Sequence, residues 1–344
     1  MFQDRTVQEL LEHHKQGQLV LVDVRSPAEF KEATIPGSIN IPLFTNEERA
    51  EIGTLYKQVS AEAAKERGLE IVSGKMPSFI RTFQQYDSPL AVFCWRGGMR
   101  SKTAATLLSL MGLPVSRLLG GVRAYRKWVV ERLEQYEFQP QAIVIGGNTG
   151  CGKTHILHEL QKQGYPVVDL EAAAGHRGSI FGGIGAAPHN QKWFDALLLD
   201  QLDRVNQAPY AVMEAESKRI GRVLLPDFLV EAKTSGVHIT IELPLQERVR
   251  TILEEYRPQE HKSQYVEAFS KIKKRIHIPI AAQIEDHLRH DEYEDAIRLL
   301  LKHYYDPRYT FAEEQYRGES VVIQADRVAE AVEAVKRYLD TSVQ

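Results

Sequence analysis

The stretch GNTGCGKT at residues 147–154 constrains the fold of this 344-residue chain more than any other feature. It matches the pattern GxxxxGK[ST], follows the apolar run QAIVIG and precedes the helical pattern HILHELQKQG. Such a P-loop belongs to an α/β fold, in which backbone N–H groups and the positive end of the helix hold a phosphate or diphosphate. We expect Lys153 to reach the outer phosphate and Thr154 to ligate Mg²⁺. The residues expected to bind the diphosphate are Gly147, Asn148, Thr149, Gly150, Cys151, Gly152, Lys153 and Thr154.

The second glycine-containing loop is CWRGGMRS, residues 94–101, which begins at one of only two cysteines. Cys94 ends the strand-like run SPLAVFC and precedes the helical pattern SKTAATLLSLMG. Backbone N–H groups, the helix dipole and the guanidinium groups of Arg96 and Arg100 would stabilise a thiolate there. We therefore interpret Cys94 as a nucleophile, and a buried, inert cysteine is the alternative. The residues expected to hold an anion beside it are Trp95, Arg96, Gly97, Gly98, Met99, Arg100 and Ser101.

The length of the chain and the order of its segments predict two α/β domains. Strand-like and helical segments alternate on both sides of a proline-marked linker near residues 139–141. We expect an N-terminal α/β domain over residues 1–138 and a P-loop α/β/α domain over residues 139–344. The second domain should carry a helix-rich, charged part over residues 245–309, and the run ESVVIQA predicts a late strand.

Composition excludes several classes of protein. No apolar run approaches the roughly 20 residues that cross a bilayer, and the first twenty residues lack a signal-peptide pattern, so we expect a soluble, cytoplasmic protein. Two cysteines give neither a disulfide framework nor zinc spacing, and Cys151 reads as a small filler of the P-loop. With a net charge of −3, any nucleic acid must bind to local basic patches.

The stretch DLEAAAGHRGS follows a strand, so its polar residues fall at the sheet edge where such folds place ligands. Asp169 and Glu171 come first, and His176, Arg177 and Ser179 follow in a loop that could reach a phosphate or tRNA. The alternative is a helix capped by Asp169 and followed by a solvated loop.

The strand pattern YAVMEA ends at Glu214, the position of a Walker B acid that would hold Mg²⁺ together with Thr154. Glu216 and Arg219 follow on the same edge, and Arg219 could instead form an interdomain salt bridge. No tightly bound cofactor is expected.

Two basic clusters could contact the phosphates of a nucleic acid, although a solvated helix face explains each equally well. Aromatic side chains could stack on a splayed base, with core packing as the alternative for the tyrosines. The clusters are Arg117, Arg123, Arg126, Lys127 and Arg132, and then Lys271, Lys273, Lys274 and Arg275; the aromatics are Trp95, Tyr304 and Tyr305.

The segment VDVRSPAEFKEATIPGSINIP, residues 22–42, together with the Cys94 loop, resembles a rhodanese domain. That resemblance implies a domain that carries sulfur or selenium on its loop cysteine. Thr34 stands where many rhodaneses have His, so no role is assigned to it. For Asp23 and Arg25 an internal salt bridge and direct catalysis are both open interpretations.

A rhodanese domain joined to a P-loop domain resembles the bacterial tRNA 2-selenouridine synthase family. The stretches LFTNEERAEIGTLYKQ, CWRGGMRS, GGNTGCGKT, DLEAAAGHRGSIFG and MEAESKRIG carry the resemblance. It implies a transferase that geranylates 2-thiouridine at the wobble position of tRNA with geranyl diphosphate, then replaces the geranylthio group with selenium from selenophosphate. The implied partners are that tRNA and the enzyme that supplies selenophosphate.

We expect the P-loop to hold the diphosphate and Cys94 to meet selenophosphate. An ATP-dependent sulfur relay for tRNA thiolation is an alternative function. A Cx₅R phosphatase that uses Cys94 and Arg100 is another, although Phe93 stands where such enzymes have His. A non-catalytic binding module is the third.

Overall fold

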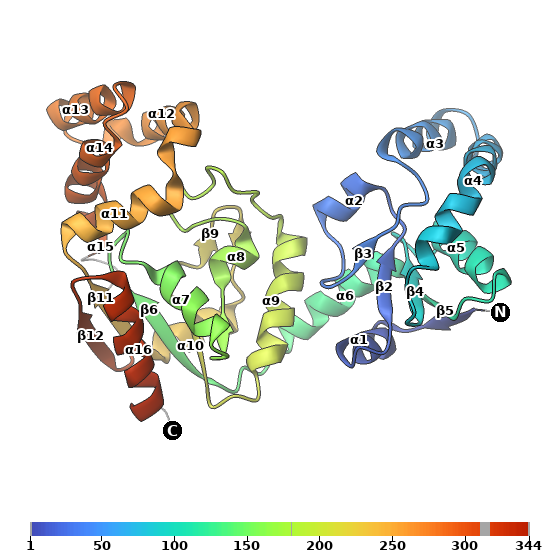
Figure 1. The fold of residues 1–344 in the computed structure, drawn as a ribbon, viewed down its shortest axis with the longest axis horizontal. Coiled ribbons are helices and arrows are strands. Elements are labelled where there is room, and N and C mark those ends of the chain that lie inside the picture. The colour runs from blue at the N-terminus through green and yellow to red at the C-terminus, as the bar shows by residue number, and fades with distance from the viewer. Residues whose placement is uncertain (1, 180, 310–316, 343–344) are drawn as a thin grey trace. The chain divides into compact units, whose positions relative to one another are not determined.

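The computed structural model describes residues 2–179, 181–309 and 317–342. The chain forms two compact units, Met1–Glu134 and Gln135–Gln344, named here the N-terminal and C-terminal units (Figure 1). Both are α/β structures with a five-stranded sheet, and each sheet is parallel throughout. The predicted fold class is therefore confirmed.

In the N-terminal unit the sheet has the strand order β1-β5-β4-β2-β3. The continuous apolar runs of β2 and β4, two of its three inner strands, form its core, because a parallel sheet is covered on both faces. Val22, Val92 and Phe93 are fully buried. The strands are β1 (Gln3–Arg5), β2 (Val20–Asp23), β3 (Ile39–Asn40), β4 (Leu90–Phe93) and β5 (Val115–Leu118).

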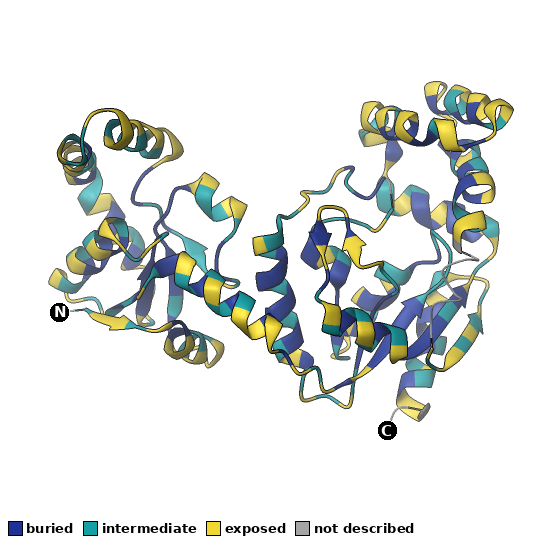
Figure 2. Cartoon of the chain, turned by 180° about the vertical axis from the view of Figure 1, so that it is seen from behind, coloured by how far each residue is buried: buried dark blue, intermediate teal, exposed yellow. Residues whose placement is uncertain are grey.

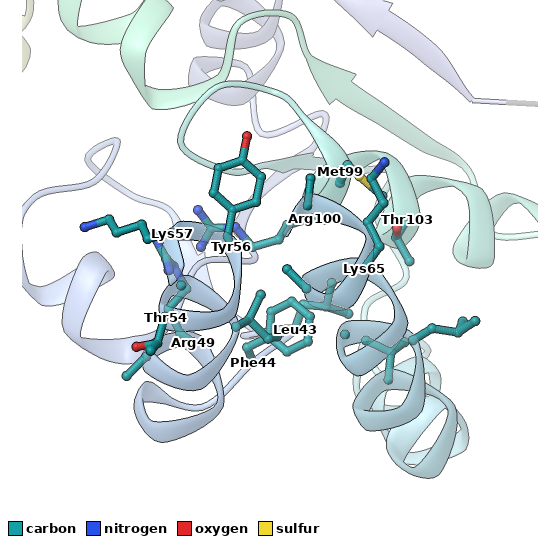
Figure 3. A pocket seen from close by; sticks show the side chains of 18 of the residues that line it. Leu43, Phe44, Arg49, Thr54, Tyr56, Lys57, Lys65, Met99, Arg100 and Thr103 are labelled. Atoms are coloured by element: carbon teal, nitrogen blue, oxygen red, sulfur yellow. The ribbon is translucent and has the colours of Figure 1, made fainter. Parts of the chain in front are cut away.

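Six helices surround this sheet. The long pair α3 and α4 follows β3, and with α5 it encloses a pocket (Figure 3). Ion pairs from Arg67 to Glu51 at 2.6 Å and from Lys75 to Glu48 join α3 to α4. The helices are α1 (Val7–Lys15), α2 (Pro27–Glu32), α3 (Asn46–Gln58), α4 (Ala61–Phe83), α5 (Met99–Leu110) and α6 (Gly121–Glu134).

The sheet of the C-terminal unit has the order β12-β11-β6-β8-β7, so the predicted late strand is present at one edge. Its inner strands are buried, as Figure 2 shows. The strands are β6 (Gln141–Gly146), β7 (Val167–Val168), β8 (Tyr210–Glu214), β11 (Val237–Glu242) and β12 (Ser320–Gln324), and β9 (Arg219–Ile220) with β10 (Val223–Leu224) forms a separate antiparallel pair.

The helices of this unit divide into those that cover the sheet and a helical part with a second apolar core of its own. The first group is α7 (Lys153–Lys162), α8 (Leu170–Ala174), α9 (Gln191–Val205), α10 (Asp227–Ser235) and α16 (Val328–Ser342). The helical part contains α11 (Leu245–Tyr256), α12 (Lys262–Ile272), α13 (Ile278–Arg289), α14 (Tyr293–Leu300) and α15 (Asp306–Tyr309), with two 3₁₀ turns (Pro258–Glu260 and Lys273–Arg275) and one π-helical turn (Leu301–Tyr305). Within the described residues no helix is both long enough and apolar enough to span a membrane.

Candidate functional site

The Cys94 loop follows β4 directly and leads into α5. The Cys94 side chain is only 3% exposed, and its Sγ lies 3.2 Å from Oγ of Ser101 in the first turn of α5. The positive end of that helix and the hydroxyl group are both suited to stabilise a thiolate. The geometry therefore combines the two interpretations of the sequence, since the thiol is buried but lies where a reactive cysteine is expected.

Two glycines allow the backbone to form this loop. Gly97 has a φ of +62°, and a Cβ on Gly121 would come within 2.1 Å of the Cys94 carbonyl oxygen. Arg117, which was predicted to belong to a basic patch, donates from its guanidinium to the Gly97 carbonyl at 2.9 Å and pairs with Asp4 at 2.7 Å. Its side chain therefore supports the loop from β5, a role that the sequence did not reveal.

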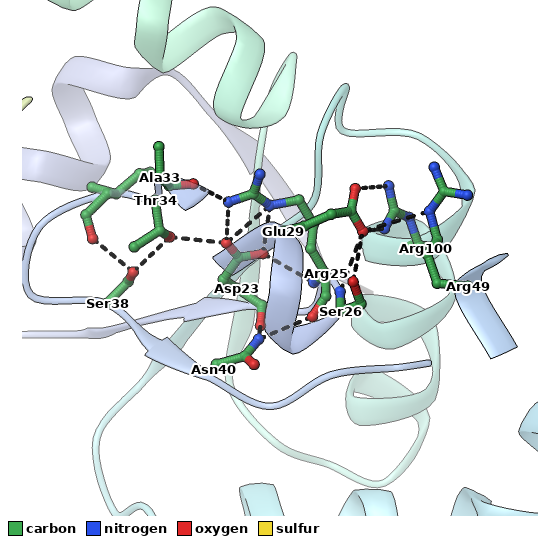
Figure 4. A network of polar contacts seen from close by, with 11 residues as sticks. Asp23, Arg25, Ser26, Glu29, Ala33, Thr34, Ser38, Asn40, Arg49 and Arg100 are labelled. Carbon is green, nitrogen blue, oxygen red and sulfur yellow. Dashed lines mark hydrogen bonds and ion pairs between the residues drawn. The ribbon is translucent and has the colours of Figure 1, made fainter. Parts of the chain in front are cut away.

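The two arginines of the loop differ in their surroundings. Arg100 donates to Glu29 of α2 at 2.5 and 3.3 Å, and Arg49 lies 3.5 Å from the same carboxylate (Figure 4). Burial raises the pKa of Glu29, but the hydrogen bond and the charge of Arg100, with that of Arg49, outweigh it and leave the pKa below its usual range. Arg96 is exposed and has no ion pair among the described residues. Of these two arginines, Arg96 is therefore the one whose charge is not paired with a described residue.

A buried network behind the loop settles the arrangement of Asp23 and Arg25. The guanidinium of Arg25 donates to Asp23 at 3.0 and 2.6 Å, and both side chains are almost fully buried, at 3% and 0% exposure (Figure 4). Thr34 donates its hydroxyl to Asp23 at 2.8 Å. Of the two open interpretations, this geometry matches the internal salt bridge.

In the C-terminal unit the P-loop joins β6 to α7 as the motif predicts. Gly147, Gly150 and Gly152 have positive φ angles, which glycine adopts without a steric penalty. The ammonium group of Lys153 donates to the Gly147 carbonyl at 2.9 Å. Cys151 is fully buried in the apolar core beneath the loop, where it acts as the small filler expected.

Arg248 of α11 holds the P-loop from outside. Its Nε donates to the Thr149 carbonyl at 2.9 Å, and its two terminal nitrogens donate to Asp306 at 3.1 and 2.6 Å. The side chain is 5% exposed. The helical part is therefore connected directly to the P-loop, by a contact that no sequence motif indicates.

Thr154, which was predicted to hold Mg²⁺ together with Glu214, contacts Glu171 in the structure. Its hydroxyl donates to a Glu171 oxygen at 2.9 Å, while the other Glu171 oxygen accepts the N–H of Gly178. The carboxylate of Glu214 accepts the N–H groups of Leu170 at 3.0 Å and Glu171 at 3.4 Å. Glu214 thus supports the residue that contacts Thr154.

These residues enclose a cavity of about 50 Å³ above the P-loop. Four residues predicted from the sheet edge, Glu171, Arg177, Ser179 and Glu216, line it together with P-loop residues. The sequence did not indicate Glu255 or Tyr256 of α11, which complete the wall. The full lining is Thr149, Gly150, Gly152, Lys153, Thr154, Glu171, Arg177, Gly178, Ser179, Glu216, Glu255 and Tyr256.

The predicted site residues of the C-terminal unit that do not line this cavity are Gly147, Asn148, Cys151, Asp169, His176, Glu214 and Arg219. Asp169 caps α8 by accepting the N–H of Ala172 at 2.7 Å and contacts His158, which matches the alternative interpretation of that stretch. His176 packs against Gly221, and burial lowers its pKa. Arg219 is exposed on β9 and forms no ion pair among the described residues.

Burial raises the pKa values of three carboxyl groups at this site, Glu214, Glu216 and Glu255. Burial and then the charge of Glu171 raise the pKa of Glu216 to about 7, although Lys153 opposes the shift. Burial and neighbouring carboxylates also raise the pKa values of Glu214 and Glu255. A proton acceptor that titrates near neutral pH therefore lies beside the P-loop.

An almost wholly apolar cavity of about 40 Å³ adjoins the cavity above the P-loop. The two cavities share Thr149, Ser179 and Tyr256, and the hydroxyl groups of Ser179 and Tyr256 lie 3.0 Å apart at the junction. The helical part supplies most of its walls, which include Ile252, Tyr265, Leu288, Ile297 and Leu300. The sequence could not place this cavity, because its residues come from segments far apart in the chain.

The predicted nucleic-acid contacts have mixed outcomes. Lys271 and Lys273 form ion pairs with Glu267 and Glu285, as a solvated helix face would. Tyr304 is 5% exposed in the core of the helical part and packs edge-on against Tyr305, so its core-packing interpretation is the one observed. In the first basic cluster, Arg123, Lys127 and Arg132 of α6 are exposed. Trp95 is partly exposed.

Comparison with known proteins gives the same two-part organisation. Residues 140–342 match the tRNA 2-selenouridine synthase AAA domain, and residues 6–127 match a rhodanese-like domain. The tRNA 2-selenouridine synthase of Sulfurovum sp. is 33% identical over 343 residues, covering 89% of this chain and 93% of that protein. The synthase of Hydrogenovibrio crunogenus is 33% identical over 323 residues, covering 85% and 88%.

The synthase of Nitrosomonas europaea is 36% identical over 245 residues, and the match covers 69% of this chain and 63% of that relative. The resemblance found in the sequence motifs is thus confirmed by a family model over the C-terminal unit and by relatives matched along most of the chain. The chain belongs to the tRNA 2-selenouridine synthase family.

Proposed function

We propose that this protein is a transferase that converts wobble 2-thiouridine in tRNA to 2-selenouridine by geranylation and then selenation. The names of its relatives support the product. The observation that carries the geranyl step is the P-loop cavity joined to an apolar cavity. An adenine or guanine base would bring several polar groups into those apolar walls, at a desolvation cost that a hydrocarbon chain avoids.

In the first step the P-loop binds the diphosphate of geranyl diphosphate. The thiouridine sulfur attacks C1 of the geranyl group, the C1–O bond breaks, and diphosphate leaves. Lys153 and the loop N–H groups stabilise the charge that develops on the diphosphate. Glu216 accepts the uridine N3 proton, so that the product is neutral, because its pKa of about 7 places it near the ambient pH. The ten-carbon chain enlarges the apolar cavity.

The residues around Thr154 suit Mg²⁺, since a hydroxyl and a carboxylate are in contact and nearby carboxylates have raised pKa values. Mg²⁺ commonly binds one or two carboxylates together with substrate phosphates. Thr154 and Glu171 would hold it, with Glu214 positioning Glu171, and the ion would supply positive charge to the diphosphate.

In the second step Cys94 is the nucleophile. Its thiolate attacks C2 of the geranylated base, the C2–S bond to the geranylthio group breaks, and geranylthiol leaves with a proton. The selenium of selenophosphate then displaces Cys94 from C2, N3 regains its proton, and water hydrolyses the P–Se bond to give phosphate. Arg96 and the loop N–H groups hold the anion. Because Cys94 is 3% exposed, the loop must open to admit the base.

The partners in this proposal are tRNA with 2-thiouridine at the wobble position and the enzyme that supplies selenophosphate. The cytoplasm is the proposed location. The basic residues of α6 are the proposed contacts to the tRNA backbone, through salt-dependent phosphate interactions.

The test is mass spectrometry of nucleosides from 2-thiouridine tRNA incubated with the full chain and geranyl diphosphate, before and after addition of selenophosphate. We expect S-geranyl-2-thiouridine first and 2-selenouridine second. Thermal unfolding with geranyl diphosphate or with ATP provides a second readout, because a ligand of the folded state raises Tm. No adduct, together with ATP turnover, would overturn the proposal in favour of an ATP-driven sulfur transfer.

A further inference from the structure

A pocket of the N-terminal unit has a lining made mostly of residues with no role in the proposed reaction. Its volume is about 830 Å³, which is within the range of sites for small molecules. Leu43, Phe44 and Val72 are buried in its wall, at 2%, 7% and 5% exposure. Leu69 and Met99, also in the lining, are 68% and 61% exposed. Apolar surface thus extends from the core of the unit to the solvent.

This pocket adjoins the Cys94 loop. Met99 and Arg100, which begin α5, belong to that loop and also line the pocket, and the next residue, Ser101, contacts Cys94 Sγ at 3.2 Å. Figure 3 shows Met99, Arg100 and Thr103 of α5 and Lys65 of α4 among the side chains that line the pocket. A ligand in the pocket would therefore lie next to the loop that carries the thiol.

The charges of the lining all have one sign. Arg49, Lys57, Lys65 and Arg100 line the pocket, and its described lining contains no Asp or Glu. Arg49 and Arg100 share Glu29, which lies outside that lining. Lys57 and Lys65 are exposed, and neither forms an ion pair with a described residue. The pocket therefore combines an apolar wall with uncompensated cations, which suits a hydrocarbon chain attached to a polyanion.

We propose that this pocket binds the geranyl chain of the S-geranylated tRNA during selenation, while Lys57 and Lys65 contact its phosphates. This inference rests on the proposed function. Holding the chain would bring C2 of the base to the Cys94 loop and would leave the geranylthiol in the pocket when the C2–S bond breaks. The N-terminal unit would then select the geranylated tRNA by its alkyl group.

The test compares two tRNAs that differ only in the alkyl group on sulfur, S-geranyl and S-methyl, as substrates for selenation by the full chain. Burial of each additional methylene raises affinity about fourfold. The wild-type protein should therefore prefer S-geranyl tRNA strongly in kcat/KM, chiefly through KM. Equal kcat/KM values for the two substrates would overturn the inference.

Two substitutions localise the preference. Leu69→Gln removes exposed apolar surface from the lining without adding charge, and Ala50→Trp fills the pocket from an exposed position on α3. Each should lower the ratio of kcat/KM for S-geranyl to S-methyl tRNA about tenfold. The matched control is Leu110→Gln, since Leu110 is 77% exposed on α5 and lies outside the lining. A ratio equal to that of the wild type in both pocket variants, with Tm unchanged, would contradict the assignment.

The exposed lysines of the pocket, Lys57 and Lys65, provide a separate measurement. Replacement of both Lys57 and Lys65 by Gln should weaken the two tRNAs equally and reduce the slope of log Kd against log salt by about two. An unchanged slope would exclude phosphate contacts there. Absence of selenation with either tRNA and every variant would instead contradict the proposed function itself, so the two failures are distinguishable.

Discussion

The Cys94 loop and the P-loop use the same backbone plan for different chemistry. Each follows a buried parallel strand and leads into a helix, so each directs the positive end of a helix at its site. In the first loop a thiol lies against a hydroxyl of that helix, whereas in the second the cysteine is buried in the core below. The carboxylates of Glu171, Glu216 and Glu255 line the P-loop cavity. The backbone geometry thus suits both loops to hold an anion, and the thiol of Cys94 suits only the first of the two to form a covalent bond.

The largest effect is expected when the thiol of Cys94 is removed, which tests whether the two loops serve different steps. Cys94→Ser should lower the rate of selenation at least about a thousandfold, as loss of a nucleophile does, and should leave geranylation intact. The measurement is nucleoside mass spectrometry of each step, with pre-geranylated tRNA for the second. Loss of both activities would show that the two loops do not act separately.

The ion pairs that support the two loops differ in burial, so their loss should lower the free energy of unfolding by different amounts. Arg25→Met leaves Asp23 charged and fully buried, which should cost about 3–5 kcal/mol of unfolding free energy. Arg248→Met leaves Asp306, which is 32% exposed and can be solvated, so the loss should be smaller. Urea unfolding of the full chain, followed by a probe in each unit, measures both. Equal losses would mean that burial does not distinguish the supports.

Removal of the Lys153 charge tests the role of the P-loop in the geranylation step. Lys153→Ala should lower the rate of geranylation by a factor of about 10²–10³, the effect of losing one donor to a developing anion. Selenation of pre-geranylated tRNA is the internal control, and it should proceed at the wild-type rate. A matching fall in that rate would place Lys153 in the second step as well.

The pH dependence should differ between the two steps. Because the pKa of Glu216 is raised to about 7, its basic form is lost as the pH falls, and geranylation should drop about tenfold for each pH unit below 7 and level off above it. Glu216→Gln should remove that inflection and lower the plateau. Selenation rates serve as the reference profile, and an inflection near 7 that persists in Glu216→Gln would assign it to another group.

The sequence predicted the parts of the fold and of the site that depend on local patterns. Continuous apolar runs marked the strands, and Glu171, Arg177, Ser179 and Glu216 were found because they follow parallel strands, whose carboxyl ends meet at one edge. Confirmation of the α/β fold follows from the same reasoning.

Contacts between distant segments were not predictable. Arg248, Glu255 and Tyr256 come from a helix about a hundred residues after the P-loop, and helical periodicity does not say which loop a helix packs on. The pairing of Arg100 with Glu29 spans 71 residues and removes a charge that the sequence assigned to the anion. For Asp169 the sequence could not distinguish a helix cap from a ligand contact, because both roles use the same residue type at the same position.

The side chain of Arg248 should couple ligand binding at the two neighbouring cavities. It ties a P-loop carbonyl to Asp306, while neighbouring side chains of the same helix, Ile252 and Tyr256, line the apolar cavity. We therefore expect occupancy of that cavity and occupancy of the loop to be coupled, and coupling between two sites is reciprocal. Lengthening the hydrocarbon chain of a diphosphate should change how tightly the loop holds its headgroup, and occupation of the loop by inorganic diphosphate should change the affinity for a free prenyl alcohol by the same factor.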